Sequence, residues 1–412
     1  MLKLFKQNKM FRVFLTYQFF SSIGSAMFSM FILLSVHLLY GNPIYTGIAG
    51  FLMAAPHVVS FAVGPIVDRR NKVAIMRLTT FLEFLVLALL AFTPLQEHLG
   101  IPFMFVVIFA YSIAALFEVP AGTALLPQIV QEEDILQANS LINIVAMAGG
   151  IAIGAILFTT LAGDVNFSFL YGFSAVFIAL AFVFALFLRN PATKETAEQS
   201  QSSSYLKDLK EGAKFIRGNV LLFILITTVM MNFVGEITYV NRPMFLEYYV
   251  GAQGYVLFTM AALVGGVLAS SFVGALGKKF KIGNLVFMLL IFSGIARVVF
   301  TLLVPIHLIS SLATMVIYAA LGTAAGIVFS SLNQKIPPKD MVGRVATIST
   351  TFNAIAVALG AFAGGFLGSV APSTGHIFIY HGISLLVIGV LIISIPSIRK
   401  LPKMNEIKKS ED

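Results

Sequence analysis

Charged residues interrupt otherwise apolar stretches of this sequence at five places: Glu83, Glu118, Glu236, Arg242 and Arg297. A charged side chain in an apolar medium costs at least about 2.5–3.5 kcal/mol, so each of them is a candidate for binding or transferring charge. Burial disfavours the charged form of a carboxyl group, which makes a buried glutamate easier to protonate. These residue types therefore predict reversible proton binding, by carboxylates that are also able to pair with a cationic ligand.

The apolar stretches around these residues are long enough to be membrane-spanning helices. Of the 412 residues, 58% are hydrophobic and 11% are charged, a composition that cannot cover the surface of a soluble protein. A helix needs about 20 apolar residues to cross the hydrocarbon core of a bilayer. The sequence thus predicts an all-α integral membrane protein with twelve spans, at residues 11–39, 44–67, 73–95, 101–126, 137–162, 166–188, 218–245, 253–276, 283–305, 308–332, 344–369 and 375–395.

Lysine and arginine are distributed asymmetrically between the breaks that separate these spans. Of the 27 Lys and Arg residues, all but Arg242 and Arg297 fall at one alternating set of breaks. The positive-inside rule produces such a bias in multi-spanning proteins. It predicts a plasma-membrane protein whose N- and C-termini are both cytoplasmic, and it explains the net charge of +9 without a nucleic-acid partner.

The predicted spans fall into two halves. We expect an N-terminal six-helix bundle at 1–188, a cytoplasmic linker with an amphipathic helix at 189–217, a C-terminal six-helix bundle at 218–398 and a cytoplasmic tail at 399–412. The segment before the fifth span, from Leu126 to Asp134, resembles the segment before the eleventh, from Leu332 to Asp340. Repeated halves of this kind are typical of secondary transporters, which rock one half against the other around a central site.

Small residues recur at a spacing of four within several spans, as at Gly360, Gly364 and Gly368. This spacing lets two helix backbones approach closely. Static packing is the simpler interpretation of any one such motif, and their presence in both halves is compatible with a sliding interface.

The most specific local motif lies in the turn between the second and third spans and reads Gly-Pro-Ile-Val-Asp-Arg-Arg-Asn-Lys from Gly64 to Lys72. It resembles the signature loop of the major facilitator superfamily, Gly-x-x-x-Asp-Arg-x-Gly-Arg/Lys, with Asn71 in place of the second glycine. Asparagine tolerates a left-handed backbone better than other non-glycine residues, so we expect Asn71 to adopt one. The resemblance implies two pseudo-symmetric six-helix bundles and a charge lock formed by Gly64, Asp68, Arg69, Lys72 and Arg344.

A narrower resemblance comes from the fourth span and its exit, Phe117 to Pro127, and from the segment Asp134 to Leu141. These residues resemble the macrolide-efflux and enterobactin-exporter branch of drug:proton antiporters. The fifth span lacks the Gly-Pro of the family's antiporter signature, and the fourth lacks its Arg-x-x-x-Gly motif, so proton coupling through that arginine does not transfer. The resemblance implies proton-coupled efflux of hydrophobic or amphipathic small molecules by alternating access. A lipid or glycolipid flippase, or an exporter of a secreted metabolite such as a siderophore, would share the same features.

In the superfamily, spans 1, 4, 7 and 10 line the cavity. This family pattern divides the charged residues into those that would face the substrate and those that would lie on supporting helices. Glu118 and Glu236 are then the candidates for coupling protons to substrate, whereas Glu83 and Arg297 on supporting helices are expected in structural polar networks. A protonated glutamate that is hydrogen-bonded to a neighbouring helix is the plainer alternative for Glu118, and contact with the outer aqueous mouth is the alternative for Glu236. The other candidate cavity residues are Gln18, Ser22, Ser25, Tyr111, Ser112, Asn232, Tyr239, Arg242, Tyr318 and Thr323. His57 is expected as a packed ring beside Pro56 rather than as a proton relay.

Other classes of protein find little support. The sequence contains no His-Glu-x-x-His, no Gly-x-Ser-x-Gly, no phosphate-binding loop and no cysteine, so we expect neither an enzyme nor a metal centre. No cofactor is expected beyond a proton gradient. The expected partners are a small-molecule substrate, protons and membrane lipids, with the protein acting as a monomer. The 39 Phe and 16 Met residues suit an adaptable, apolar cavity wall.

Overall fold

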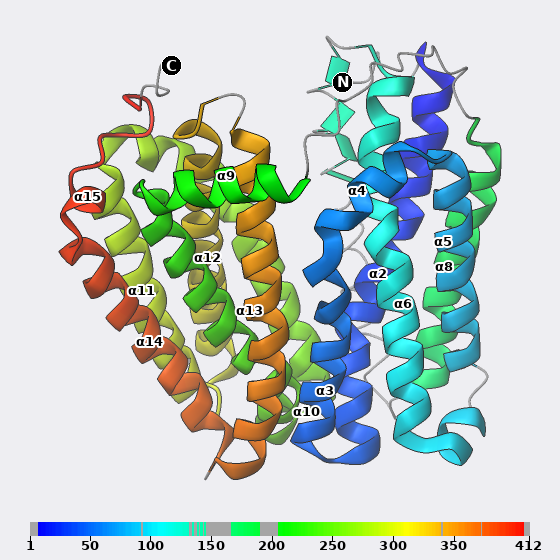
Figure 1. Ribbon diagram of the computed structural model, residues 1–412. Helices are drawn as coiled ribbons and strands as arrows, with labels where there is room; N and C mark the ends of the chain where they lie inside the picture. Colours follow the sequence, from blue (N-terminus) through cyan, green and yellow to red (C-terminus); the bar gives the residue numbers. More distant parts are fainter. Residues whose placement is uncertain are drawn as a thin grey trace. The chain divides into compact units, whose positions relative to one another are not determined.

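Helices make up all the regular secondary structure in the described part of the chain (Figure 1). The computed structural model describes residues 7–407 except 92–93, 132–133, 136–137, 140, 143, 146–165, 190–204, 339–340 and 372. The chain divides into two compact units, Met1–Thr196 and Ala197–Asp412. The predicted all-α class is confirmed.

The first unit contains the helices that correspond to the predicted spans 1 to 4 and 6. They are α2 (Lys9–Tyr40), α3 (Pro43–Ala54), the 3-10 turn η1 (Ala55–Val59), α4 (Ser60–Asp68), α5 (Lys72–Ala91), α6 (Pro94–Ile129) and α8 (Phe167–Phe187). The predicted second span is thus formed by three consecutive pieces, because Pro56 interrupts the α-helix with a 3-10 turn. Most of the predicted fifth span, 137–162, lies outside the described residues.

The second unit contains a short helix followed by the helices of the predicted spans 7 to 12. They are α9 (Tyr205–Arg217), α10 (Leu221–Lys279), α11 (Ile282–Leu303), α12 (Leu308–Lys335), α13 (Val342–Val370), α14 (Thr374–Ser394) and α15 (Pro396–Arg399). The 59-residue α10 includes both the seventh and the eighth span, and the chain reverses between them at Gly251, whose φ is 69°. Only glycine adopts that backbone region without strain.

Polar side chains set the starts of several helices. Asn8, Asn42 and Asn166 each accept a hydrogen bond from a backbone N–H in the first turn of α2, α3 and α8. Asn71 does the same for α5, where its side chain accepts from the N–H of Ala74 over 3.0 Å. No described residue other than glycine has a positive φ, so the left-handed backbone expected at Asn71 is wrong. Asparagine serves there as a helix cap.

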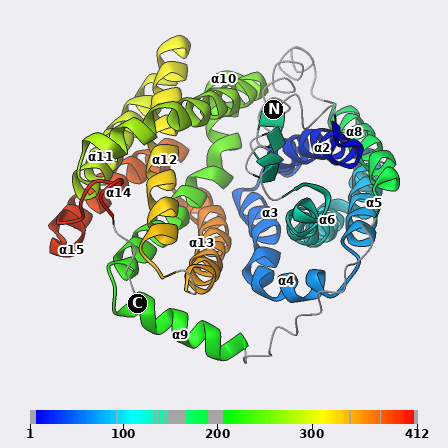
Figure 2. The same ribbon diagram turned by 90° about the horizontal axis from the view of Figure 1, so that it is seen from above.

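Within the first unit, α6 runs between the α3–α4 pair and α5, and α8 packs against both α2 and α5 (Figure 2). Within the second unit, α10 packs against α12 and α13, and α11 against α12 and α14. The α10–α13 contact uses the predicted small residues: a Cβ atom at Gly360 would lie 2.5 Å from the carbonyl oxygen of Phe233. Static close packing therefore accounts for this motif.

The outer surfaces of the helices are apolar. Large side chains such as Val119, Phe187 and Ile309 are 72%, 63% and 73% exposed. Ten described helices are long and apolar enough to cross a membrane, and one of these, α10, is long enough for two crossings. A lipid bilayer is the solvent in which such a surface is stable, so the chain is a multi-pass membrane protein.

Candidate functional site

A cavity of about 460 Å³ opens in the first unit beside Glu118. Its polar wall is formed by Gln18, Ser21, Ser22, Ser25, His57, Glu118, Thr123 and Asn139. Apolar side chains, among them Phe14 and Leu126, complete the lining. The predicted candidates Gln18, Ser22, Ser25 and Glu118 thus share one cavity, whereas Ser112 is buried and donates to the Ile108 carbonyl of its own helix. His57 is exposed to this cavity, so the packed ring expected for it is wrong.

Two hydroxyl groups of α2 hold the carboxyl group of Glu118. Tyr17 Oη and Ser21 Oγ each donate to Glu118 Oε1 over 2.5 Å. They lie four residues apart on α2, which places both on one face of the helix. Short hydrogen bonds of this length are typical of a hydroxyl donating to a charged carboxylate. The arrangement stabilises one oxygen of Glu118 while the side chain remains only partly buried at the cavity wall.

Glu83 lies behind this wall on α5 and has 0% exposure. Neither of its carboxyl oxygens has a hydrogen-bond partner among the described residues. The groups that interact with it electrostatically are the carboxyl of Glu118 and the hydroxyls of Tyr17 and Tyr111. The structural polar network expected around Glu83 therefore includes the candidate site itself.

Tyr111 joins the same cluster from α6. Its hydroxyl donates to Ser25 Oγ over 3.1 Å, and its ring stacks on Phe28 at a centroid distance of 3.8 Å. Tyr111 is 4% exposed, so it supports the cavity wall instead of lining it.

The second unit gathers its charged residues around aromatic rings. Helix α10 carries Glu236, Tyr239 and Arg242 at intervals of three residues. Glu236 interacts electrostatically with Arg242. The Arg242 guanidinium carbon lies 4.7 Å from the centre of the Tyr239 ring and 5.2 Å from that of Tyr255. Cations are attracted to the faces of aromatic rings, which offsets part of the cost of keeping Arg242 out of water.

Arg297 of α11 is 3% exposed and lies among three rings. Its guanidinium carbon is 4.4 Å from the ring centre of Phe378, 4.7 Å from Tyr318 and 5.3 Å from Phe300. Its Nε has no hydrogen-bond partner among the described residues. The His381 ring lies perpendicular to the Tyr318 ring, with 6.0 Å between the ring centres, and its Nδ1 shares a 2.8 Å hydrogen bond with Thr238 Oγ1. The predicted cavity residue Tyr318 therefore belongs to an aromatic surround of Arg297.

The remaining candidates of the second unit contact other helices. Asn232 is exposed on α10, and its amide donates to Asn353 of α13 over 3.1 Å. Thr323 of α12 approaches Gly266, whose Cβ position would lie 3.8 Å from the hydroxyl. Asn241, which the sequence did not single out, donates to the carbonyl of Gly364 over 2.8 Å.

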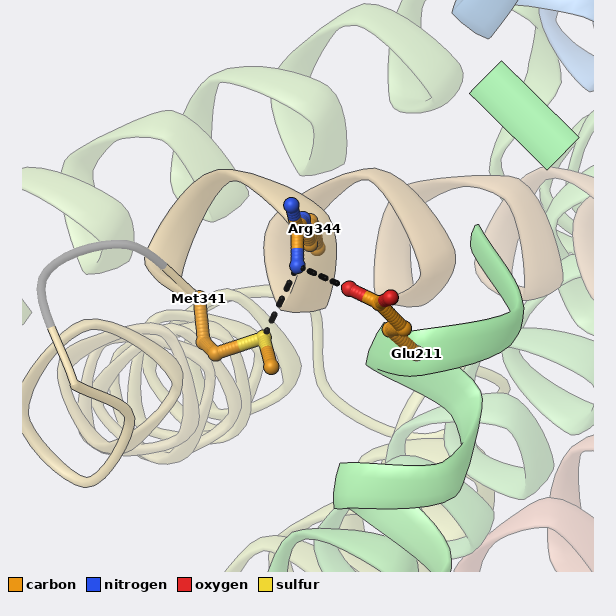
Figure 3. A network of polar contacts seen from close by, with 3 residues as sticks. All are labelled: Glu211, Met341 and Arg344. Carbon is orange, nitrogen blue, oxygen red and sulfur yellow. Dashed lines mark hydrogen bonds and ion pairs between the residues drawn. The ribbon is translucent and has the colours of Figure 1, made fainter. Parts of the chain in front are cut away.

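The residues of the predicted lock lie in or next to α4, α5 and α13. Gly64 is in α4, Arg69 is exposed after it and Lys72 begins α5, while the side chain of Asp68 lies outside the described part of the structure. Arg344 of α13 donates to Glu211 of α9 over 2.6 Å and to the sulfur of Met341 over 3.7 Å (Figure 3). Glu211 is a partner of Arg344 that the sequence did not predict.

Arg77 has a structural task at the same end of the first unit. Its guanidinium donates to the carbonyls of Ala185, Leu186 and Leu188 at the end of α8, over 2.7–3.0 Å. Carbonyls in the last turn of a helix lack partners within the helix, and a cation there is favoured by the helix dipole. A second cavity of about 750 Å³ lies beside this contact and is lined by Lys9, Asn71, Arg77 and Arg189 together with apolar residues.

Comparison with known proteins identifies the family. The sequence profile of the Major Facilitator Superfamily matches residues 13–361. This chain therefore belongs to the Major Facilitator Superfamily, a class of membrane transporters, as its signature loop predicts. The chain is also similar to macrolide efflux protein A of Streptococcus pyogenes, with 21% identity over 389 residues that cover 92% of this chain and 94% of the relative.

Solved structures share the fold. The nucleoside transporter NupG superimposes with a TM-score of 0.74 at 14% identity, covering 94% of this chain and 98% of that one. A D-xylose-proton symporter gives 0.75 at 12% identity, covering 97% and 98%. Because these transporters act on different substrates, the likeness establishes the fold of this chain and not its substrate.

Proposed function

We propose that this transporter is a proton-coupled exporter of hydrophobic or amphipathic small molecules that works by alternating access. Similarity to a macrolide efflux protein supports the direction of transport. The position of Glu118 supports proton coupling. Its carboxyl group is bound by two hydroxyls on one side and borders a cavity on the other.

A single carboxyl group in that position is able to couple the binding of a proton to the binding of a substrate. As a carboxylate, Glu118 would attract a cationic or hydrogen-bonding substrate into a cavity whose wall is part apolar and part polar. As a neutral acid, it would release that attraction. Competition between proton and substrate for one group is a sufficient physical basis for antiport, because each bound species lowers the affinity for the other.

The same proposal includes the location, orientation and partners of the protein. We place it in the plasma membrane as a monomer with both termini cytoplasmic, in contact with lipids, protons and a small-molecule substrate and without a bound cofactor. The alternating lysine and arginine content of the loops supports this orientation. Asp68, Arg69 and Lys72 would form the cytoplasmic lock with the start of α13.

Transport in proteoliposomes tests the proposal. Purified protein is assayed under an imposed pH gradient with a panel of macrolides and lipophilic cations. We expect gradient-driven accumulation by the wild type and its loss in Glu118→Gln, with Asp134→Asn, at an acid outside the lining of this cavity, as the matched control. Accumulation that ignores the gradient and survives Glu118→Gln would refute proton coupling.

A flippase on the same fold is distinguished by its cargo. In the same vesicles, movement of fluorescent phospholipid or glycolipid between leaflets, with no transport of soluble compounds, would favour that alternative. A siderophore exporter would instead transport an iron chelator and leave macrolides untouched.

A further inference from the structure

Glu83 is a buried acid for which the proposed function has no task. We infer that Glu83 and Glu118 form a carboxyl–carboxylate pair that holds one proton between α5 and α6. This inference deepens the proton coupling proposed above, because it identifies a second residue of the proton site.

Helix geometry places the two acids on facing surfaces. Tyr17 Oη lies 2.5 Å from Glu118 Oε1 and 3.1 Å from Thr80 Oγ1. Thr80 and Glu83 are three residues apart on α5, so they share a face of that helix. One hydroxyl of α2 thus reaches both the Glu118 carboxyl and the face of α5 that bears Glu83.

Among the described residues of the first unit, no lysine or arginine forms an ion pair with Glu83 or Glu118. The sequence has no Lys or Arg at residues 13–68 or 78–188, which include all of predicted spans 2, 4, 5 and 6. Arg77, at the start of α5, is bound to the end of α8. The ionisable groups that interact with Glu83 and Glu118 are the hydroxyls of Tyr17 and Tyr111, and His57 lines the same cavity.

The missing hydrogen-bond partner of Glu83 has a simple explanation. A carboxylate only accepts hydrogen bonds, so two ionised carboxylates have no bond to make with each other. A proton on either group turns it into a donor. Because a fully buried charge without a partner is far more costly than a neutral acid, the proton belongs on Glu83, which then donates to Glu118.

The pair then carries one negative charge, and that charge lies on the residue that borders the cavity. A second proton arriving from the cavity would bind Glu118 and make the pair neutral. On its release the proton returns to cavity water, while the first proton stays with Glu83. Two acids that share a proton titrate as a unit in two separate steps.

Infrared spectroscopy of the purified full-length protein tests the pair without any substrate. At pH 8 we expect the wild type to show the carbonyl stretch of a protonated carboxyl group, and we expect Glu83→Gln to lose it. Glu83→Asp, which keeps an acid, and Asp134→Asn, which removes an acid outside the cluster, should both retain the band. A band that persists in Glu83→Gln would overturn the assignment.

A second variant keeps the test decisive where Glu83→Gln fails to fold. In Glu118→Gln the proton on Glu83 loses a charged acceptor, so its band should move to higher frequency; an unmoved band would also overturn the pair. Gradient-driven transport is measured in parallel. If the infrared bands confirm the pair but transport does not respond to the pH gradient, only the proposed proton coupling is refuted. If transport is coupled to the gradient but the band is absent, only the pair is refuted.

Discussion

Arg344 of α13 and Glu211 of α9 form an ion pair with 2.6 Å between Nη1 and Oε2. The two side chains are 29% and 41% exposed, so water screens part of their attraction. The pair fastens an amphipathic helix across the end of the second unit, where α9 packs against α13 (Figure 1). Arg344 therefore helps to hold α9 against α13, in addition to being a candidate residue of the cytoplasmic lock.

Glu211→Gln should loosen α9. An exposed ion pair contributes about 0.2–1 kcal/mol, so amide exchange in α9 should accelerate up to about fivefold. Hydrogen exchange measured by mass spectrometry reads this out, with Lys210→Ala as the control on the same helix. The double variant Glu211→Arg with Arg344→Glu should recover slow exchange, and unchanged exchange in Glu211→Gln would show that the pair does not hold the helix.

Tyr17→Phe should make Glu118 easier to protonate. The variant removes one donor to the carboxylate, and a hydrogen bond to a charged group contributes about 1.5–3 kcal/mol. The charged form loses stability and the neutral form does not, so the pH profile of transport should move to higher pH. Tyr171→Phe is the matched control, because that hydroxyl bonds to Ser35 elsewhere in the unit. A shift to lower pH would contradict the donor role of Tyr17.

Phe378→Leu should destabilise the second unit. The variant removes the ring nearest to the Arg297 guanidinium, and a desolvated cation–π contact contributes about 2 kcal/mol. The apparent melting temperature in detergent should fall further than for Phe329→Leu, the control at a ring that is also buried, with 2% exposure, but is not among the rings around Arg297. Equal effects at both positions would show that burial of apolar area, and not the cation, sets the result.

Gly360→Ala should also lower stability, because its Cβ atom would lie 2.5 Å from the Phe233 carbonyl oxygen. Overpacking of this kind costs about 1–3 kcal/mol. Gly326→Ala is the control, since no heavy atom lies within 4 Å of its Cβ position. The two variants are compared by thermal unfolding in the same detergent, and equal stability would contradict the tight α10–α13 contact.

The order and approximate bounds of the spans were predictable, because they depend on the length of each apolar segment and on the positions of lysine and arginine. Both properties are read directly from the sequence. The break at Gly251, the starts of α11 and α12 and the helix at 205–217 follow local rules of that kind. Asn71 shows the limit of such rules, because the same residue type serves left-handed turns and helix caps equally well.

The hydrogen-bond partners of Glu118 within the candidate site could not be predicted from the sequence. Tyr17 and Ser21 lie in an apolar span, and nothing in their spacing distinguishes them from packing residues; their importance depends on how α2 faces α6. The same holds for Glu83, whose separation from Glu118 along the chain conceals that the two acids interact. Rotation of one helix against another is a tertiary property, which periodicity does not encode.

Arg77 has a consequence for experiments on topology. Its side chain terminates α8 by binding three of the last carbonyls, although its charge is also one of those that mark the loops of one side. Substituting it would expose the end of the sixth span and erase an orientation signal at once. A charge-reversal scan read only by membrane insertion would then mistake a folding defect for a change of sidedness, so Arg69 and Arg70, which are exposed, are the better positions for measuring orientation.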